Sequence, residues 1–400
     1  MKKLIILFFL STMLLVACNP TEIEVSDSSD WELQLAMIKD KKVFELPDKL
    51  DAKVTDGLVI DADILVSKEK NRNEASELVL TRHIYTDKEI QENMISLIEA
   101  SSFNYTEMKK RVKSSVDEWS AFETEIERTR YDLELDTYNG ICSTANGFML
   151  TTIDSARVVD LVQYPFEKRA VQFSYEEKQE LDFGKWEEAW KSIQNVLKEC
   201  DVELLTDMHC YTLDLENLQN NLEKYHAEGA DFYFQNTGEE AKYTKEDEVY
   251  FFQFQQGYNG IPICKYQLDQ TLEKQDFGYG VYSNGYAMYS GNGLINISTS
   301  NLLDIEDVEK SQRIVPLSDI LEKSVSYLKT LATSDTSIEV KEISLCYLPT
   351  LKDAEKMEFQ AIPVWVVAYI QTSAFVGETE VTVDYSKYDV FNAFSGERIY

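Results

Sequence analysis

Residues 58–66 read Leu-Val-Ile-Asp-Ala-Asp-Ile-Leu-Val, so that apolar and acidic side chains alternate. A period of two predicts a β-strand with one buried and one solvated face. Asp61 and Asp63 fall on the solvated face. The side chains on the buried face are Leu58, Ile60, Ala62, Ile64 and Val66. Strands of this kind are typical of antiparallel sheets that pack one face on a core.

Helical patterns lie between the strand patterns. After a second predicted strand at 78–84, Thr86 and Glu89 match a capping box, which marks the start of a helix. Ser174 and Glu177 match the same motif further on. Stripes of apolar residues predict helices at 108–126, 186–197, 215–227 and 317–331. Strands are predicted within 138–173 and at 202–212, 249–255, 261–268, 279–282, 294–298, 338–347, 362–372, 380–385 and 390–394.

This succession predicts an α+β fold with mixed or antiparallel sheets, each packed with helices. Pro262 and Pro363 hold corresponding places in the last two blocks, which suggests a duplicated helix-plus-sheet unit. A tight hairpin is expected at the end, with its turn at Ser395-Gly396. The expected division is a signal peptide at 1–17, a lipid anchor and tether at 18–45 with a short helix near 31–38, and three α+β domains at 46–173, 174–300 and 301–400.

The N-terminus has the layout of a bacterial lipoprotein signal. Lys2 and Lys3 precede an apolar run, and Leu15-Val16-Ala17 leads directly to Cys18. This run is too short for a transmembrane helix, which needs about 20 residues. We therefore expect cleavage before Cys18 and a diacylglycerol on its sulfur, whose two chains anchor stably. We expect the protein to lie on the extracellular face of the cell membrane. The membrane is an expected partner, bound through the lipid on Cys18.

Composition limits the remaining partners. The formal charge is −32, and removal of Lys2 and Lys3 makes it −34. Such a chain repels nucleic acid, so no nucleic-acid partner is expected. Apart from Cys18 there are five cysteines, without a CxxC pair that would favour structural zinc. If a disulfide forms, Cys200 and Cys210 are the expected pair, but buried thiols are the preferred interpretation.

Several residue groups were candidates for chemistry. Asp61 and Asp63 share a strand face and could bind a cation or act as an acid/base pair, although solvent-facing strand residues explain them equally well. His209 and Cys210 are adjacent, and adjacent strand residues point to opposite faces. The stretch from Phe277 to Gly293 could form an aromatic surface for sugar or peptide. Because no metal-binding or nucleophile motif occurs, we expect no catalytic residue, no metal site and no cofactor.

Three short motifs carry a family resemblance, namely Asp61-Ala62-Asp63-Ile64, Gly260-Ile261-Pro262-Ile263 and Ile362-Pro363-Val364-Trp365. With them the chain resembles a family of uncharacterised lipoproteins of Firmicutes. The C-terminal block is similar to PepSY-like and YycH/YycI-like modules, which end in a hairpin of the form Asn-Ala-x-x-Gly-Glu, here Asn392 to Glu397. The resemblance implies extracytoplasmic inhibition or regulation of a partner protein. The YycH/YycI proteins use a membrane helix as anchor, in place of a lipid.

Together these observations predict a lipid-anchored extracytoplasmic protein of the cell envelope that binds or regulates another component without catalysis. A possible extracytoplasmic protein partner follows from this. An extracellular hydrolase acting on glycan or peptide is the first alternative, with catalytic acids that the sequence does not single out. A solute-binding lipoprotein is the second, although its alternating βα units are not apparent.

Overall fold

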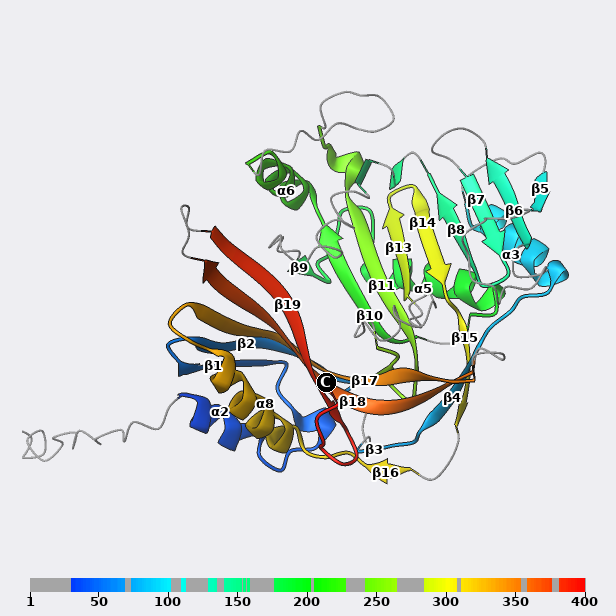
Figure 1. The fold of residues 1–400 in the computed structure, drawn as a ribbon. Helices are drawn as coiled ribbons and strands as arrows, with labels where there is room; N and C mark the ends of the chain where they lie inside the picture. The colour runs from blue at the N-terminus through cyan, green and yellow to red at the C-terminus, as the bar shows by residue number, and fades with distance from the viewer. Residues whose placement is uncertain are drawn as a thin grey trace, which may run out of the picture.

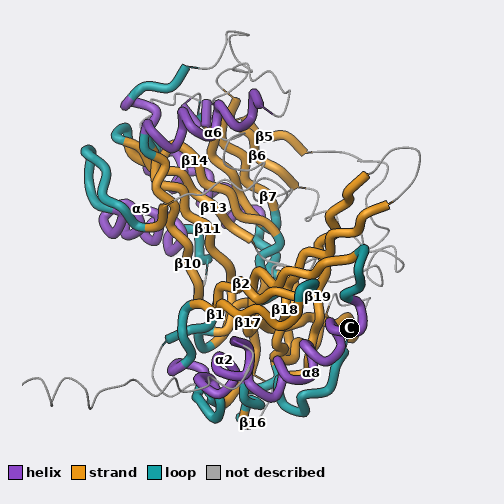
Figure 2. Tube along the Cα trace, turned by 90° about the vertical axis from the view of Figure 1, so that its left-hand side faces the viewer, coloured by secondary structure: helices purple, strands orange, loops and turns teal. Residues whose placement is uncertain are grey.

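The computed structural model describes residues 30–68, 73–101, 109–112, 129–134, 140–152, 154–155, 157–158, 176–202, 205–227, 242–264, 284–307, 311–353, 358–375 and 381–399. Within these ranges the fold is α+β and is built on two large sheets (Figure 1). Turned by 90°, the molecule shows the two sheets one above the other, with α6 at one end and α2 and α8 at the other (Figure 2).

The first sheet mixes parallel and antiparallel strands. Its order is β1-β2-β17-β18-β4-β15, with β19 also paired to β18, and only β2 and β17 run parallel among the described pairs. The strands are β1 (Lys49–Thr55), β2 (Leu58–Leu65), β4 (Leu78–Arg82), β15 (Leu303–Asp307), β17 (Thr336–Asp353), β18 (Glu358–Phe375) and β19 (Val381–Asn392). A small separate pair joins β3 (Glu74–Ala75) and β16 (Gln312–Arg313).

Helices α2 (Asp30–Ile38) and α8 (Leu317–Leu331) cover one face of the first sheet (Figure 1). The apolar stripe predicted for α8 is buried, as is the predicted face of β2. Both belong to one core, whose centre is the fully buried Trp365. The indole of Trp365 donates a hydrogen bond to the carbonyl of Val315, 3.1 Å away, so its polar atom is satisfied inside the core.

The second sheet is antiparallel throughout. Its order is β5-β6-β7-β8-β14-β13-β11-β10-β9, with β12 on β11. The strands are β5 (Lys109–Val112), β6 (Thr129–Glu134), β7 (Gly140–Thr144), β8 (Gly147–Thr151), β9 (Glu176–Glu177), β10 (Leu205–Leu213), β11 (Val249–Tyr258), β12 (Ile261–Pro262), β13 (Asn284–Ser290) and β14 (Gly293–Ser300). Helices α3 (Asp87–Ala100) and α5 (Trp186–Glu199) pack their apolar stripes on one face. On the other face lie α6 (Leu215–Ala227) and the short helix η2 (Lys245–Asp247).

The expected division into three successive domains is wrong at the level of the sheets. Strands β2 and β4, expected in the N-terminal domain, pair with β17, β18 and β15 of the C-terminal one. The second sheet takes strands from both the 46–173 and 174–300 blocks. The second sheet and its helices therefore form an insertion between β4 and β15, which neighbour one another in the first sheet. A chain can return to its sheet in this way because the two ends of the inserted part lie side by side.

The folded body includes part of the predicted tether. Trp31, Ile38 and Val43 are buried in the core of the first sheet, so the folded body includes residues from Asp30 onward and does not begin at residue 46. The predicted helix at 31–38 is confirmed, whereas the one at 108–126 is wrong at its start, where Lys109–Val112 forms strand β5. The rest of that segment lies outside the described residues.

The two matched prolines do not occupy equivalent places. Pro262 ends the short strand β12, whereas Pro363 lies inside the 18-residue strand β18. One edge of β18 pairs with β4 up to Ala361 and with β19 from Val364 onward, so Pro363 falls in the gap between these partners. A residue without an N–H is tolerated there. The position of Pro363 thus gives no support to a duplicated unit.

The two predicted capping boxes, each of which marks the start of a helix, had opposite outcomes. The capping box of Thr86 and Glu89 is confirmed, with reciprocal hydrogen bonds at the start of α3. The box predicted at Ser174 and Glu177 is wrong, because Glu177 belongs to strand β9 and the next helix begins at Trp186. Among the described residues no helix has the length and apolar character needed to span a bilayer.

Candidate functional site

A row of polar side chains crosses the middle of the second sheet, on the face opposite α3 and α5. The strand register places His209 opposite Gln253, Gln253 opposite Tyr286, Tyr286 opposite Ser298, and Ser298 opposite Met149. Directly opposed residues of antiparallel strands share one face, with Cβ atoms about 5 Å apart. We call these five residues, on β10, β11, β13, β14 and β8, the polar row.

The polar row is partly open to solvent. His209, Gln253, Tyr286 and Ser298 are half-buried, and Met149 is 37% exposed. The next row along the same strands is closed, since Phe251 and Met288 are buried in one cluster with Leu218 of α6 and with Tyr243. The face is therefore covered at one end and accessible at the other.

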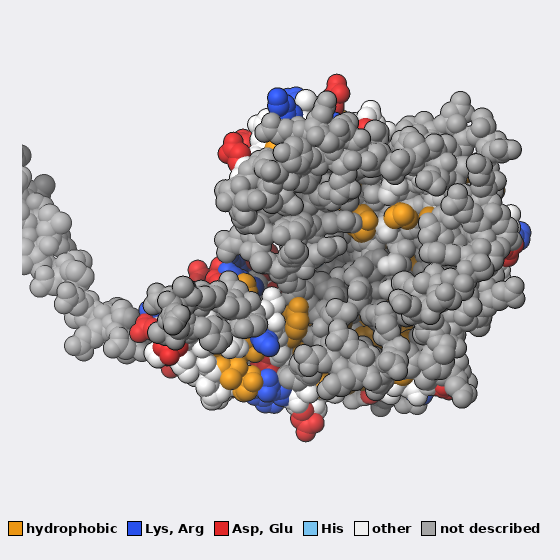
Figure 3. All heavy atoms as spheres, turned by 45° about the horizontal axis from the view of Figure 1, so that its top comes forward, with side chains coloured by type: hydrophobic (Ala, Val, Ile, Leu, Met, Phe, Trp, Pro, Cys, Tyr) orange, Lys and Arg blue, Asp and Glu red, His pale blue; other side chains and the backbone are white. Residues whose placement is uncertain are grey.

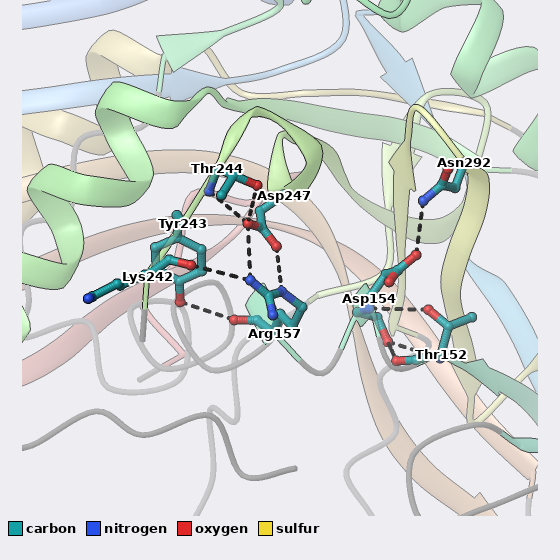
Figure 4. Close-up of polar contacts among 9 residues, drawn as sticks. Thr152, Asp154, Arg157, Lys242, Tyr243, Thr244, Asp247 and Asn292 are labelled. Atoms are coloured by element: carbon teal, nitrogen blue, oxygen red, sulfur yellow. Dashed lines mark hydrogen bonds and ion pairs between the residues drawn. The ribbon is translucent and has the colours of Figure 1, made fainter. Parts of the chain in front are cut away.

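A hydrogen-bonded network closes the covered end (Figure 4). The guanidinium of Arg157 donates from Nε to one carboxylate oxygen of Asp247 at 2.5 Å and from Nη2 to the other at 3.2 Å. Asp247 is buried, and its hydrogen bond and charge hold the pKa of Arg157 above its ordinary value. The phenol of Tyr243 donates to the carbonyl of Arg157 at 3.0 Å. A bidentate pair with a buried carboxylate fixes both partners geometrically.

Local sequence explains how this network forms. Thr244 and Asp247 make a capping box at the start of η2. The box holds the Asp247 carboxylate in the position where it also binds Arg157. Thr152 and Ser155 exchange hydrogen bonds between side chain and backbone, which sets the turn that follows β8. The amide of Asn292 reaches Asp154 at 3.1 Å and fastens this turn to the β13–β14 hairpin. The network therefore fixes the border of the open face.

Two glycines allow the strands beneath the polar row to approach closely. A Cβ on Gly147 would lie 2.3 Å from the carbonyl oxygen of Thr299 on the neighbouring strand β14. A Cβ on Gly285 would lie 1.8 Å from the ring of Phe254, which covers that position on the opposite, core-facing side. A side chain at position 147 would push against the backbone of β14, whereas one at position 285 would have to displace the ring of Phe254.

Of the two aspartates predicted as a possible acid/base pair, Asp61 forms ion pairs on the first sheet. Asp61 lies 2.6 Å from the ammonium of Lys49 and 3.7 Å from that of Lys341. The hydrogen bond from Lys49 lowers the pKa of Asp61 below its ordinary value, which keeps this carboxylate ionised. Asp63 is exposed on the same strand face. Acidic and basic side chains of described residues also lie next to one another elsewhere on the surface (Figure 3).

The His209–Cys210 prediction is confirmed in its geometry. Cys210 is fully buried against the core beneath α5, whereas His209 belongs to the opposite face and to the polar row. Cys200 and Cys210 are both buried and are not joined to each other by a disulfide. Burial raises the pKa of Cys200 to about 12.

The aromatic surface predicted at 277–293 exists only in part. Tyr286 lies in the polar row, but Tyr289 packs on the opposite core, so the two rings do not form one surface. Tyr279 and Tyr282 lie outside the described residues, as does Cys18.

The sequence did not single out Gln253, Ser298 and Met149 as candidates. Counting outward from the β13–β14 turn at Gly291-Asn292 would have paired Tyr286 with Ile297, because the register shifts by one residue between Met288 and Tyr289. The partners of β14 and β11 are too distant in sequence to be counted.

Within the described ranges, no three histidine, cysteine, aspartate or glutamate side chains are grouped so that they could share one metal ion.

No family model and no curated protein matches this chain. Among solved structures, it is similar to the crystal structure of an uncharacterised protein from Eubacterium rectale ATCC 33656. The sequence identity is 21%, the TM-score is 0.70, and the match covers 94% of this chain and 99% of that one. At this identity the likeness shows the shared fold.

Proposed function

We propose that this protein is a lipid-anchored, extracytoplasmic binding module that takes its ligand on the polar row of the second sheet. The observation that supports binding is the register itself, which aligns five partly accessible side chains over adjacent strands. The support for the location is the Leu15-Val16-Ala17-Cys18 motif that follows the short apolar run. Cys18 is the residue that would carry the lipid.

The chemistry of the polar row suits an uncharged ligand rich in hydroxyl groups. Gln253 offers an amide that both donates and accepts, Ser298 a hydroxyl, and His209 an imidazole. The ring of Tyr286 and the thioether of Met149 provide apolar surface beside these polar groups. A chain of net charge −32 repels anionic ligands, which favours a neutral glycan of the envelope over a charged polymer.

The location is tested first by anchoring. Cells expressing the chain are fed an alkyne-bearing fatty acid, and the protein is partitioned into detergent. We expect label and detergent-phase partitioning for the parent, and loss of both in Cys18→Ala. A parent that stays unlabelled in the aqueous phase would refute the anchor.

Binding is tested with soluble fragments of envelope glycan by calorimetry. We expect Gln253→Ala and Ser298→Ala each to raise the Kd roughly tenfold, which corresponds to a loss of about 1.4 kcal/mol in binding free energy. Gln34→Ala on α2 is the control, because it removes the same amide far from the polar row. Equal affinity in all variants would exclude the polar row. Crosslinking in intact cells from position 253 distinguishes a glycan ligand from a protein partner. A crosslinked protein would indicate that the module regulates that partner.

A further inference from the structure

Helix α2 leaves an apolar face uncovered. Leu33 and Met37 are 60% and 44% exposed, and side chains four positions apart lie on the same side of a helix. The opposite side of α2 packs Trp31 and Ile38 into the core of the first sheet at 6% and 0% exposure. Among the described residues five large apolar side chains are exposed, and α2 carries two of them. Packing of the inner side fixes the direction in which the outer pair points.

Basic residues follow this face in a strongly acidic chain. Lys39 and Lys42 are exposed and Lys41 is half-exposed, directly after the end of α2. The ammonium of Lys42 lies 5.6 Å from the centre of the Phe44 ring. The acidic residues Asp30 and Glu32 lie in the first turn, at the other end of the helix. The end of α2 therefore joins apolar surface to positive charge, the combination that suits lipid headgroups.

The position of α2 in the chain ties it to the anchor. Asp30 follows Cys18 by 12 positions (30 minus 18), and a fully extended chain spans at most about 3.6 Å per residue. The start of α2 therefore stays within about 40 Å of a lipid on Cys18. In the folded body α2 lies with α8 at the end opposite the second sheet (Figures 1 and 2).

We propose that α2 rests on the lipid bilayer itself, with Leu33 and Met37 at the boundary between headgroups and acyl chains and Lys39 and Lys42 on the headgroup phosphates. The contact is small, but the anchor makes it an intramolecular event with a high effective concentration. This orientation points the second sheet and its polar row away from the membrane, toward ligands outside the cell. The inference rests on the lipid anchor proposed above.

Methionine oxidation tests this contact directly. The lipidated full-length protein is reconstituted in vesicles of phosphatidylcholine with added phosphatidylglycerol and exposed to hydroxyl radicals. We expect Met37 to be oxidised several-fold more slowly than Met149, although the two side chains have similar exposure in the folded chain. A photoactivatable phospholipid in the same vesicles should label the peptide that contains α2. Vesicles of phosphatidylcholine alone should give weaker protection, since they lack the charge that attracts Lys39 and Lys42.

Variants separate docking from anchoring. Leu33→Glu should raise oxidation of Met37 to the rate of Met149 and abolish lipid labelling of α2, while the protein remains in the vesicle fraction. Ile95→Glu, which changes an exposed apolar residue on α3 (46% against 60% for Leu33), should leave both readouts as in the parent. Anchored protein with Met37 and Met149 oxidised alike would overturn the inference and leave the proposed function standing. Protein that does not enter the vesicle fraction would overturn both.

Discussion

Leu303 lies directly opposite Arg82 in an antiparallel strand pair, although 221 positions separate them (303 minus 82). The chain leaves the first sheet at the end of β4, builds the second sheet, and returns beside its point of departure. The backbone carbonyls of His83 and Leu302 both accept from the amide of Asn146, at 2.5 and 2.9 Å. One buried amide thus ties the outgoing and the returning chain together at the junction of the two sheets.

Gln256 is the second tie at this junction. Its buried side chain donates to the carbonyl of Leu303 at 3.0 Å and accepts from the N–H of Leu303 at 2.8 Å. Gln256→Ala leaves both backbone groups buried without these partners, and we expect a loss of about 2 kcal/mol in the free energy of unfolding. Urea denaturation of the parent and the variant measures this loss. Gln253→Ala, on the half-exposed face of the same strand, should change stability by less than about 0.5 kcal/mol.

Asp389 is a fully buried carboxylate next to the C-terminal hairpin. It forms an ion pair with Arg398 and accepts a hydrogen bond from Ser324 at 2.6 Å, while the guanidinium of Arg398 lies 3.6 Å from the centre of the Tyr327 ring. Removing the carboxylate leaves the buried Ser324 hydroxyl without this partner and the 37% exposed Arg398 side chain without its ion pair, so Asp389→Ala should cost about 2 kcal/mol. Thermal unfolding followed by circular dichroism checks this. A shift as small as that of the exposed-pair variant Asp56→Ala would show that the pair is unimportant.

The cysteines provide a test of burial. The five cysteines other than Cys18 are buried, and reaction with an alkylating reagent requires the thiolate. At pH 8 we expect Cys200, with its pKa raised to about 12 by burial, to stay unlabelled by iodoacetamide in the folded protein. In denaturant all five should be labelled. Mass spectrometry counts the labels, and a Cys200–Cys210 disulfide would instead leave two cysteines unlabelled in denaturant without reductant.

The capping box of α3 should be visible in the pH dependence of stability. The backbone N–H of Thr86 donates to Glu89, and this bond lowers the pKa of Glu89 below its ordinary value of 4.5. A carboxylate with a lowered folded-state pKa contributes stability above the unfolded value, which is lost as the pH falls through the folded one. Glu89→Gln should therefore flatten the stability curve below about pH 4.5.

The other half of the box is tested at neutral pH. Thr86→Ala removes the hydroxyl that accepts from the N–H of Glu89 and should cost about 1 kcal/mol of unfolding free energy. Ser101→Ala, at the other end of α3, is a control for a general effect of shortening side chains on this helix. Equal losses in both variants would contradict a specific capping role.

Sequence periodicity predicted individual elements well where one face is buried. Strand β2 and helices α3, α5, α6 and α8 lie where their apolar stripes placed them, and the α+β class followed from their succession. Periodicity failed at Lys109–Val112, where an apolar stripe suggested a helix but the chain pairs with β6 as a strand. The competing signal is a pairing partner about 20 residues away, which a local pattern does not contain.

The candidate site shows the same limit. In the sequence, Tyr286 stands out among glycines and aromatic residues, and His209 stands out beside Cys210. That the two belong to one row depends on β10, β11 and β13 being neighbours in that order. Ser298 and Met149 join them through a pair of strands that are about 150 residues apart in the chain.

By itself, the sequence determined the acidic charge and most of the elements, and it led to the expectation of a lipid on Cys18, because each depends on residues close together in the chain. The tertiary structure alone decided that the second sheet is inserted between β4 and β15, that α2 belongs to the folded body, and that the polar row exists. The physical reason is that strand pairing joins backbone groups which are alike in every residue, so the choice of partner is made by the burial of whole faces and not by a local motif.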